Sequence, residues 1–276
     1  MTNQEIDDLI LRTRALITTD EARLLFELAK DSSPEGVIVE IGSYKGGSTV
    51  FLAKGSMSGN KNKVYAVDPH IFPKYTFMGK GDFYLGDELV AKDSLPYFKE
   101  NIKREGVENM VTSIVSSSKK AAAKWNKPIS LLWIDGDHRY KYVKTDFIKW
   151  EKHLITGGII ALHDYNNEGR LFKPLNYVNK KEPGIDKLVK KKILESKRFE
   201  EIKTVDSIIY ARKKRAAGTV EIIKNFLFSS FFFLYPTNDY LKLIGRFMDI
   251  TGSYLKRFSP RTYHVLKKII NGGYGK

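Results

Sequence analysis

Short apolar runs alternate with amphipathic stretches through the middle of the chain. The runs have the length of buried strands and lie at residues 37–41, 64–68, 111–115, 130–135 and 158–163. The amphipathic stretches have helical spacing and lie at residues 47–57, 94–105, 118–125 and 140–153. Strands that alternate with helices in this way build a parallel sheet covered on both faces. The pattern therefore predicts a doubly wound, mostly parallel α/β domain.

Further elements are predicted on both sides of this alternation. Two helices precede it, over residues 4–17 and 21–30, and Thr19-Asp20 is expected to be the N-cap of the second. A basic helix over 185–197 and a strand pair over 199–204 and 207–212 follow it. We therefore expect three parts: a helical lead-in over residues 1–33, the α/β domain over 34–212 and a C-terminal extension over 213–276.

Positive charge is concentrated in the extension. The chain has a formal net charge of +15, and the twelve Lys and Arg of residues 213–276, against three acids, supply nine of these charges. The extension also has six aromatic residues within positions 226–235. Basic residues beside aromatic ones favour binding to an anionic membrane surface. The alternative is a helical element that packs on the domain or on a second copy of the chain in a homodimer.

Composition limits the class of protein. A chain of 276 residues with 42% hydrophobic content can bury a sizeable core. It has no cysteine, which excludes disulfides and thiolate metal sites. The first residues lack a secretory pattern, and no apolar stretch has the length of a membrane span. We expect a cytoplasmic protein, which the extension would hold at the inner face of a membrane.

The first predicted strand runs into a glycine-containing turn. Gly42 and Gly46 let the backbone approach a ligand closely, but a dinucleotide fingerprint would also have glycine where this chain has Tyr44. The carboxylate of Glu40 disfavours a pyrophosphate and favours a positively charged ligand. Asp68 ends the second strand, where an acid accepts hydrogen bonds from ribose hydroxyls. These residues indicate a nucleoside with a cationic amino-acid arm.

Acidic and imidazole side chains follow two later strands. Asp135 and His138 come after one strand, and His163 and Asp164 come at the end of the next. In an open α/β sheet, ligands bind outside the carboxyl ends of the strands. Together these four side chains therefore predict a reaction centre, although each alone could be a polar residue satisfied by backbone amides.

The sequence resembles the class I S-adenosylmethionine-dependent methyltransferases, and within them a group of small-molecule O-methyltransferases. The resemblance is carried by I-D-G-D-H, which ends at His138, by Asp146 and Trp150 on the next helix, and by G-G-x-x-x-x-H-D, which ends at Asp164. It covers about residues 34–212 and implies a seven-stranded Rossmann-like sheet.

The resemblance also implies which residues bind S-adenosyl-L-methionine. Glu40 and Gly42 would contact the methionine arm, Asp68 the ribose, and Ser117 the surroundings of the adenine. The full set of expected cofactor contacts is Glu40, Gly42, Ser43, Gly46, Asp68, Ser117 and Asp135.

Two routes to an electron-rich acceptor oxygen remain open. In many relatives the acids that end the fourth and fifth strands, here Asp135 and Asp164, hold a divalent cation such as Mg²⁺. Relatives often have a third acid or amide beside the second of these, where this chain has Tyr165. Alternatively His138, three residues beyond Asp135, acts as the general base. Both routes make Asp135 essential for catalysis.

We therefore expect methyl transfer to a hydroxyl oxygen of a small molecule, with a sugar or glycan precursor as a candidate. The glycine- and aromatic-rich connection over residues 69–93 would form a lid over this acceptor or an ordinary surface loop. Nucleic-acid methylation is one alternative, because the chain is basic. However, the charge clusters in the extension, and the amine-methylating motif N/D-P-P-Y/F is absent. An inactive cofactor-binding scaffold is the other alternative.

Overall fold

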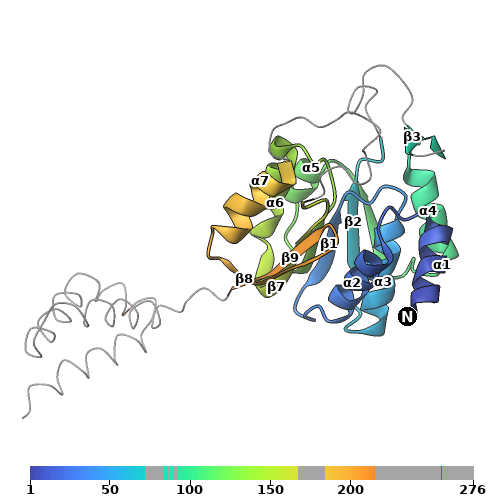
Figure 1. Cartoon of the computed structure of the whole chain (residues 1–276), viewed down its shortest axis with the longest axis horizontal. Helices are drawn as coiled ribbons and strands as arrows, with labels where there is room; N and C mark the ends of the chain where they lie inside the picture. Colours follow the sequence, from blue (N-terminus) through green and yellow to red (C-terminus); the bar gives the residue numbers. More distant parts are fainter. Residues whose placement is uncertain (72–83, 86–87, 90–92, 167–183, 215–255, 257–276) are drawn as a thin grey trace, which may run out of the picture. The chain divides into compact units, whose positions relative to one another are not determined.

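The structure is a computed structural model that describes residues 1–71, 84–85, 88–89, 93–166, 184–214 and 256 (Figure 1). The chain divides into two compact units, residues 1–214 and 215–276, and the elements below belong to the first. Among the described residues, no helix combines the length and apolarity needed to cross a membrane. The extension lies almost wholly outside the described residues, so its expected membrane role remains a prediction.

A seven-stranded sheet forms the centre of the first unit. In spatial order its strands are β5 (Val111–Val115), β2 (Val64–Asp68), β1 (Val37–Ile41), β6 (Ile129–Ile134), β7 (Leu154–Leu162), β9 (Ile208–Lys213) and β8 (Phe199–Val205). The first five are parallel, whereas β9 runs antiparallel to both β7 and β8. The predicted doubly wound, mostly parallel seven-stranded sheet is confirmed.

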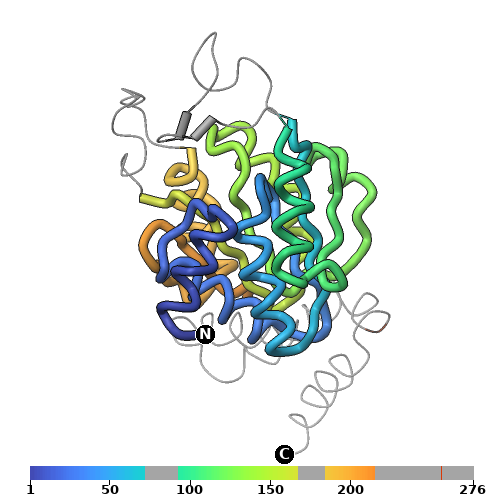
Figure 2. The backbone as a smooth tube through the Cα atoms, turned by 90° about the vertical axis from the view of Figure 1, so that its right-hand side faces the viewer, coloured from blue at the N-terminus to red at the C-terminus, as the bar shows by residue number. Residues whose placement is uncertain are grey.

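Helices cover both faces of this sheet (Figure 1). One layer contains α1 (Asn3–Thr13), α2 (Thr19–Lys30), α3 (Gly47–Ser58) and α4 (Leu95–Arg104), and it faces the viewer in Figure 2. The other contains α5 (Ser118–Ala123), α6 (Tyr140–Glu151), α7 (Gly184–Val189) and the π-helical turn η2 (Lys190–Leu194). Along β6, Leu131 and Trp133 pack in the first layer, whereas Leu132 and Ile134 pack in the second, as the alternation of a strand requires.

The lead-in helices end and begin at other residues than expected. The first ends at Thr13 rather than at residue 17, because Arg14 adopts a left-handed conformation (φ 53°) that terminates a helix. The N-cap of the second is Thr18, not Thr19-Asp20. The Thr18 hydroxyl accepts a hydrogen bond from the N–H of Glu21, whose carboxylate accepts the Thr18 N–H in return.

Smaller differences occur later in the chain. The strand expected over 158–163 begins at Leu154, and the basic helix over 185–197 is α7 followed by η2, which ends at Leu194. The connection over 69–93 contains a two-stranded antiparallel pair, β3 (Tyr84–Leu85) and β4 (Glu88–Leu89). Most of this connection lies outside the described residues, so its expected role as a lid remains a prediction.

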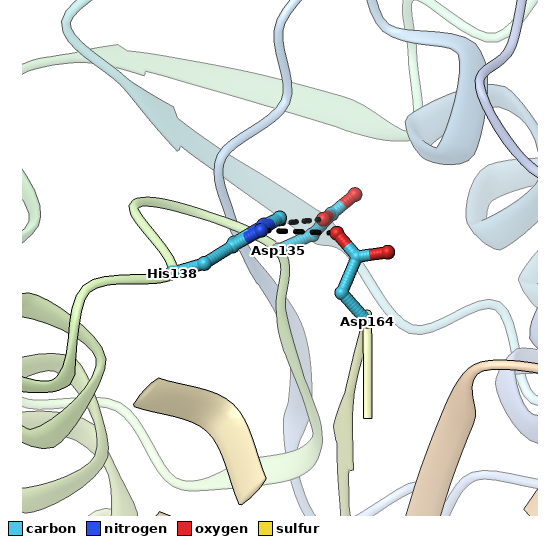
Figure 3. A group of neighbouring side chains, drawn as sticks. All are labelled: Asp135, His138 and Asp164. Atoms are coloured by element: carbon cyan, nitrogen blue, oxygen red, sulfur yellow. Dashed lines mark ion pairs between the residues drawn. The ribbon is translucent and has the colours of Figure 1, made fainter. Parts of the chain in front are cut away.

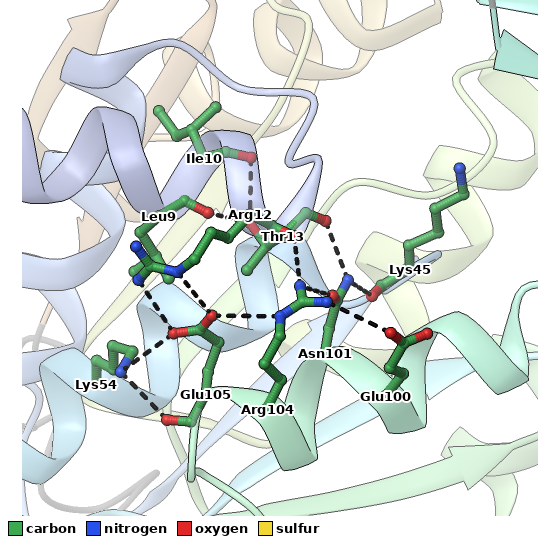
Figure 4. A network of polar contacts seen from close by, with 10 residues as sticks. All are labelled: Leu9, Ile10, Arg12, Thr13, Lys45, Lys54, Glu100, Asn101, Arg104 and Glu105. Atoms are coloured by element: carbon green, nitrogen blue, oxygen red, sulfur yellow. Dashed lines mark hydrogen bonds and ion pairs between the residues drawn. The ribbon is translucent and has the colours of Figure 1, made fainter.

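A polar network fastens α1 and α4 to the turn that follows β1 (Figure 4). The side-chain amide of Asn101 donates hydrogen bonds to the main-chain oxygens of Thr13 (3.0 Å) and Lys45 (2.8 Å). Glu105, which has a nearly buried side chain, pairs with Arg12 at 3.1 Å and with Lys54 at 3.7 Å. Asn101 therefore connects the end of α1 to the turn after β1, and Glu105 connects α1 to α3.

Candidate active site

The register of the central strands brings the predicted site residues to one edge of the sheet. Ile41 of β1 lies opposite Val67 of β2 and Ile134 of β6, and Ile134 lies opposite Leu162 of β7. The residues that follow these positions therefore share one level: Gly42, Asp68, Asp135 and His163. The strand order reverses between β1 and β6, which is where open α/β sheets bind ligands.

The turn after β1 needs glycine at two positions. Gly42 has φ +87°, and a Cβ there would lie 2.2 Å from the main-chain oxygen of Asp135. Gly46 has φ +83°, and a Cβ there would lie 2.9 Å from the ring of Phe98. Both conformations are unfavourable for residues with a Cβ. The glycines therefore allow the turn to lie directly against β6 and α4.

Asp68 organises this turn from the neighbouring strand. Its two carboxylate oxygens accept hydrogen bonds from the N–H groups of Tyr44 (2.8 Å) and His70 (2.6 Å). Tyr44 itself has a positive φ of 45°. The carboxylate therefore stabilises the turn, and Asp68 itself is nearly buried. The expected contact of Asp68 with a ribose remains a prediction.

Ser43 and Ser117 occupy different environments. Ser43 is buried, and within the described part of the chain its hydroxyl has no hydrogen-bond partner. Such an unsatisfied buried hydroxyl is a group that a ligand can satisfy. Ser117 is exposed at the start of α5, next to Ser116, whose N–H donates to the main-chain oxygen of Asp68 at 3.1 Å. The expected contacts of Ser43 and Ser117 with the cofactor remain predictions.

Glu40 is buried beneath the turn and is not exposed at the surface of the site. Its side chain is fully buried, and its oxygens accept hydrogen bonds from the hydroxyls of Ser48 and Thr49 in α3. Burial, with repulsion from Asp135 and Asp68, raises the pKa of Glu40 to about 8 although the two hydroxyls oppose the shift. A cation bound nearby would favour the ionised form.

The acids and imidazoles that follow β6 and β7 come together, and Figure 3 shows three of them: Asp135, His138 and Asp164. Nδ1 of His138 lies 3.0 Å from Oδ2 of Asp164, and Nε2 of His138 lies 3.7 Å from Oδ1 of Asp135. His163 reaches the same Asp135 oxygen from the other side, with its Nδ1 at 3.0 Å. All four side chains that the sequence singled out therefore form one cluster.

The carboxylates change the charge of His138. Burial lowers its pKa, but hydrogen bonds and charge attraction from Asp135 and Asp164 outweigh burial and raise the pKa to about 9. The imidazole is consequently protonated at neutral pH in the free protein. It has to lose this proton before it can serve as a general base.

Glu21 of α2 is a member of the cluster that the sequence did not reveal. Its Oε2 lies 3.4 Å from Nε2 of His163, which is 142 positions away in the chain. Burial raises the pKa of Glu21, but hydrogen bonds from His163 and Ser207 outweigh it and lower the pKa to about 2. Burial lowers the pKa of His163, but its contacts with Asp135 and with Glu21 outweigh burial and raise the pKa well above its usual value. The Thr-x-x-Glu pattern signals only a helix cap, so no local signal could have found this contact.

Three of these side chains could share a cation. One ligand atom each of Asp135, His138 and Asp164 lies within 4.8 Å of the others. Two carboxylates suit Mg²⁺, whereas an imidazole is more typical of transition-metal sites. A metal would also have to displace the proton of His138, because only the neutral ring binds one.

Known proteins resemble this chain in part of its sequence and in its fold. Residues 39–165 match a family described as a methyltransferase domain. The fold is similar to cofactor-bound Rv0187 from MTB, with 15% identity over 77% of this chain and 89% of that one and a TM-score of 0.52. It is similar to the O-methyltransferase NovP, with 17% identity over 73% and 82% and a TM-score of 0.53. A Corynebacterium glutamicum protein gives 11% identity over 76% and 92%, with a TM-score of 0.54. At these identities the structural likeness concerns the fold.

Proposed function

We propose, from the premise that this chain is a class I S-adenosylmethionine-dependent methyltransferase, that it methylates a hydroxyl oxygen of a small molecule. The observation that carries the proposal is the cluster of Asp135, His138 and Asp164 at the sheet edge beside the glycine turn. The similar fold of an O-methyltransferase supports oxygen as the acceptor atom. Tyr140 and Tyr165 follow the same two strand ends, and their rings suit a sugar or glycan precursor.

The glycine turn and its neighbours suit the cofactor. Gly42 gives the close approach of backbone that a nucleoside needs, and the buried hydroxyl of Ser43 has an unused hydrogen-bonding group. Asp68 would hold the ribose, and Glu40 would favour the positive charge of the methionine arm. When bound, S-adenosylmethionine supplies an electrophilic methyl group on a positively charged sulfur. Calorimetry with S-adenosylhomocysteine tests this part directly.

His138 would accept the proton of the acceptor hydroxyl. As the oxygen bonds to the methyl carbon, the bond from this carbon to sulfur breaks and its electron pair goes to sulfur. The O–H bond breaks as well, and Nε2 of His138 would take the proton while Asp164 holds Nδ1. The ring must be neutral beforehand, and a nearby positive charge lowers the pKa of His138 from its value of about 9. Asp135 stabilises the imidazolium that results.

Mg²⁺ held by Asp135 and Asp164 is the other route to an electron-rich acceptor oxygen. A divalent cation lowers the pKa of a bound hydroxyl and leaves open positions for it. Turnover in excess EDTA separates the two routes. Full activity without metal would support His138 as the base and remove the metal, whereas loss of activity restored by Mg²⁺ would support the cation.

The acceptor can be sought in cells. We would compare metabolites and glycans from cells that carry the intact enzyme with those from an Asp135→Asn strain, by mass spectrometry. Compounds heavier by one CH₂ group only with the intact enzyme are the expected result. Modified nucleotides in RNA instead would support the nucleic-acid alternative, and no methylated product at all would support an inactive scaffold.

We extend the proposal to the location of the enzyme through its basic, aromatic extension. Anionic lipid attracts clustered Lys and Arg, and aromatic side chains insert at the membrane interface. The full chain is expected to float with anionic liposomes, whereas residues 1–214 are expected to remain behind. Equal flotation would disprove the membrane role, and light scattering of the same two samples would test for a homodimer held by the extension.

A further inference from the structure

A buried carboxylate of the lead-in reaches the candidate active site. Glu21 lies on α2, outside the matched residues 39–165, and its side chain is almost fully buried. Burial of a charged group is costly unless its hydrogen bonds are satisfied. The partners of Glu21 therefore indicate why a charge is kept at this place.

Each oxygen of Glu21 has two donors. Oε1 accepts the N–H of Ser207 at 2.9 Å and its hydroxyl at 2.6 Å. Oε2 accepts the N–H of Thr18 at 2.9 Å and faces Nε2 of His163 at 3.4 Å. The Ser207 and Thr18 bonds join α2 to the β8–β9 hairpin and complete a helix cap. The contact with His163 serves neither of these purposes.

His163 carries the contact onward to the reaction centre. Its ring is buried beside Trp133, with ring centroids 5.4 Å apart, and its two nitrogens face carboxylates on opposite sides. Nδ1 lies 3.0 Å from Oδ1 of Asp135, the oxygen that also faces His138. A ring bound at both nitrogens cannot rotate without breaking one contact. Glu21 therefore fixes the orientation of the His163 ring, and the ring in turn fixes the direction from which His163 contacts Asp135.

We infer that Glu21 is a positioning residue of the methyltransferase site, which acts through His163 to orient Asp135 for the cofactor and for His138. The inference rests on the proposed function, because it assigns Asp135 to that site. It also extends the working unit of the enzyme to the lead-in, beyond the methyltransferase-domain match. Removal of the outer-shell partners of metal ligands typically changes affinity or activity by about 10- to 100-fold, and we expect an effect of similar kind for Glu21.

A double-mutant cycle tests the inference with the full chain. Affinity for S-adenosylhomocysteine is measured by calorimetry for the wild type, Glu21→Ala, His163→Ala and the double variant. Each single variant is expected to bind about tenfold more weakly. If Glu21 acts through His163, the double variant binds about as weakly as His163→Ala alone, because residues in one chain of contacts are not additive. Should Glu21→Ala fail to fold, Glu21→Gln and His163→Gln complete the same cycle.

Ser207→Ala is the matched control. It removes one bond to the other oxygen of Glu21 and leaves the His163 contact in place. We expect it to lower the melting temperature and to leave the affinity within about twofold of wild type. Independent losses from Glu21 and His163, or an equal loss of affinity in Ser207→Ala, would overturn the inference. A wild type that does not bind S-adenosylhomocysteine would instead overturn the proposed function.

Discussion

His138 and Asp164 form an ion pair across the ends of two adjacent strands, with 3.0 Å between Nδ1 and Oδ2. The pair arises because β6 and β7 are parallel and in register, so residues after their last strand positions meet. Its main consequence is the charge of the imidazole. The pKa of about 9 means that the base form of His138 appears only as the pH rises.

The first prediction concerns this pKa. In wild-type protein, the ring of His138 should titrate near 9 by NMR, and Asp164→Asn should move the midpoint toward the usual 6.5 because one stabilising carboxylate is removed. His153 is an internal control, since burial lowers its pKa and Asp164 is not among the causes. If His138 is the base, kcat/KM should rise with pH up to about 9, because this ratio reports the pKa of the free enzyme. A wild-type midpoint near 6.5 would contradict the prediction.

The second prediction concerns the turn. Gly42→Ala should lower stability and abolish cofactor binding, because its Cβ would lie 2.2 Å from the main-chain oxygen of Asp135. Gly157→Ala is a matched control, with φ +78° and no atom within 4 Å of the new Cβ. The control should cost about 1–2 kcal/mol from the left-handed conformation alone. Urea unfolding and calorimetry compare the two, and equal losses would argue against the close packing of the turn on β6.

The third prediction concerns Asp68. Asp68→Asn replaces one acceptor with an NH₂ group that faces the N–H of Tyr44 or His70, so the turn loses a hydrogen bond. Affinity for S-adenosylhomocysteine should fall by about tenfold or more, as expected for a charged hydrogen bond. The control is Asp137→Asn, which changes a surface pair with Arg139. Unchanged affinity in Asp68→Asn would contradict the proposed contact between Asp68 and the ribose.

The fourth prediction concerns stability and pH. Because the folded pKa of Glu40 is raised to about 8, its contribution to stability is fully present below about 4.5 and is lost as the pH rises through about 8. Glu40→Gln cannot ionise, so its melting temperature should fall less than that of wild type over this range. Glu35→Gln, at an exposed position, should follow wild type. Parallel curves for all three proteins would show that Glu40 is not held neutral.

Much of the fold could be predicted from the order of polar and apolar residues. The strands at 37–41, 64–68 and 111–115 have the expected bounds. The first two are buried, mostly apolar runs between breakers, whereas β5 lies at the edge of the sheet and is largely exposed. Helix ends were harder. Arg14 terminates α1 by a left-handed conformation that no local pattern requires, and the N-cap of α2 is Thr18 instead of the predicted Thr19-Asp20.

The candidate site, like the fold, could be predicted only in part from the sequence. The residue pattern predicted that Asp68 ends a parallel strand and that Asp135, His138 and Asp164 follow the ends of two others, and parallel strands bring such ends to one edge. How these groups interact depends on the folded structure. Glu40 became a buried, nearly neutral acid, and His138 a protonated ring between carboxylates.

Glu21 shows the reason for the difference. Its own neighbours in sequence define a helix cap, and the sequence determines this much locally. Its contact with His163 depends on how α2 packs on the far end of the chain, and such packing follows from shape and burial rather than from spacing. Periodicity therefore determined the sheet and the strand-end residues, whereas burial and long-range pairing decided their charges and partners.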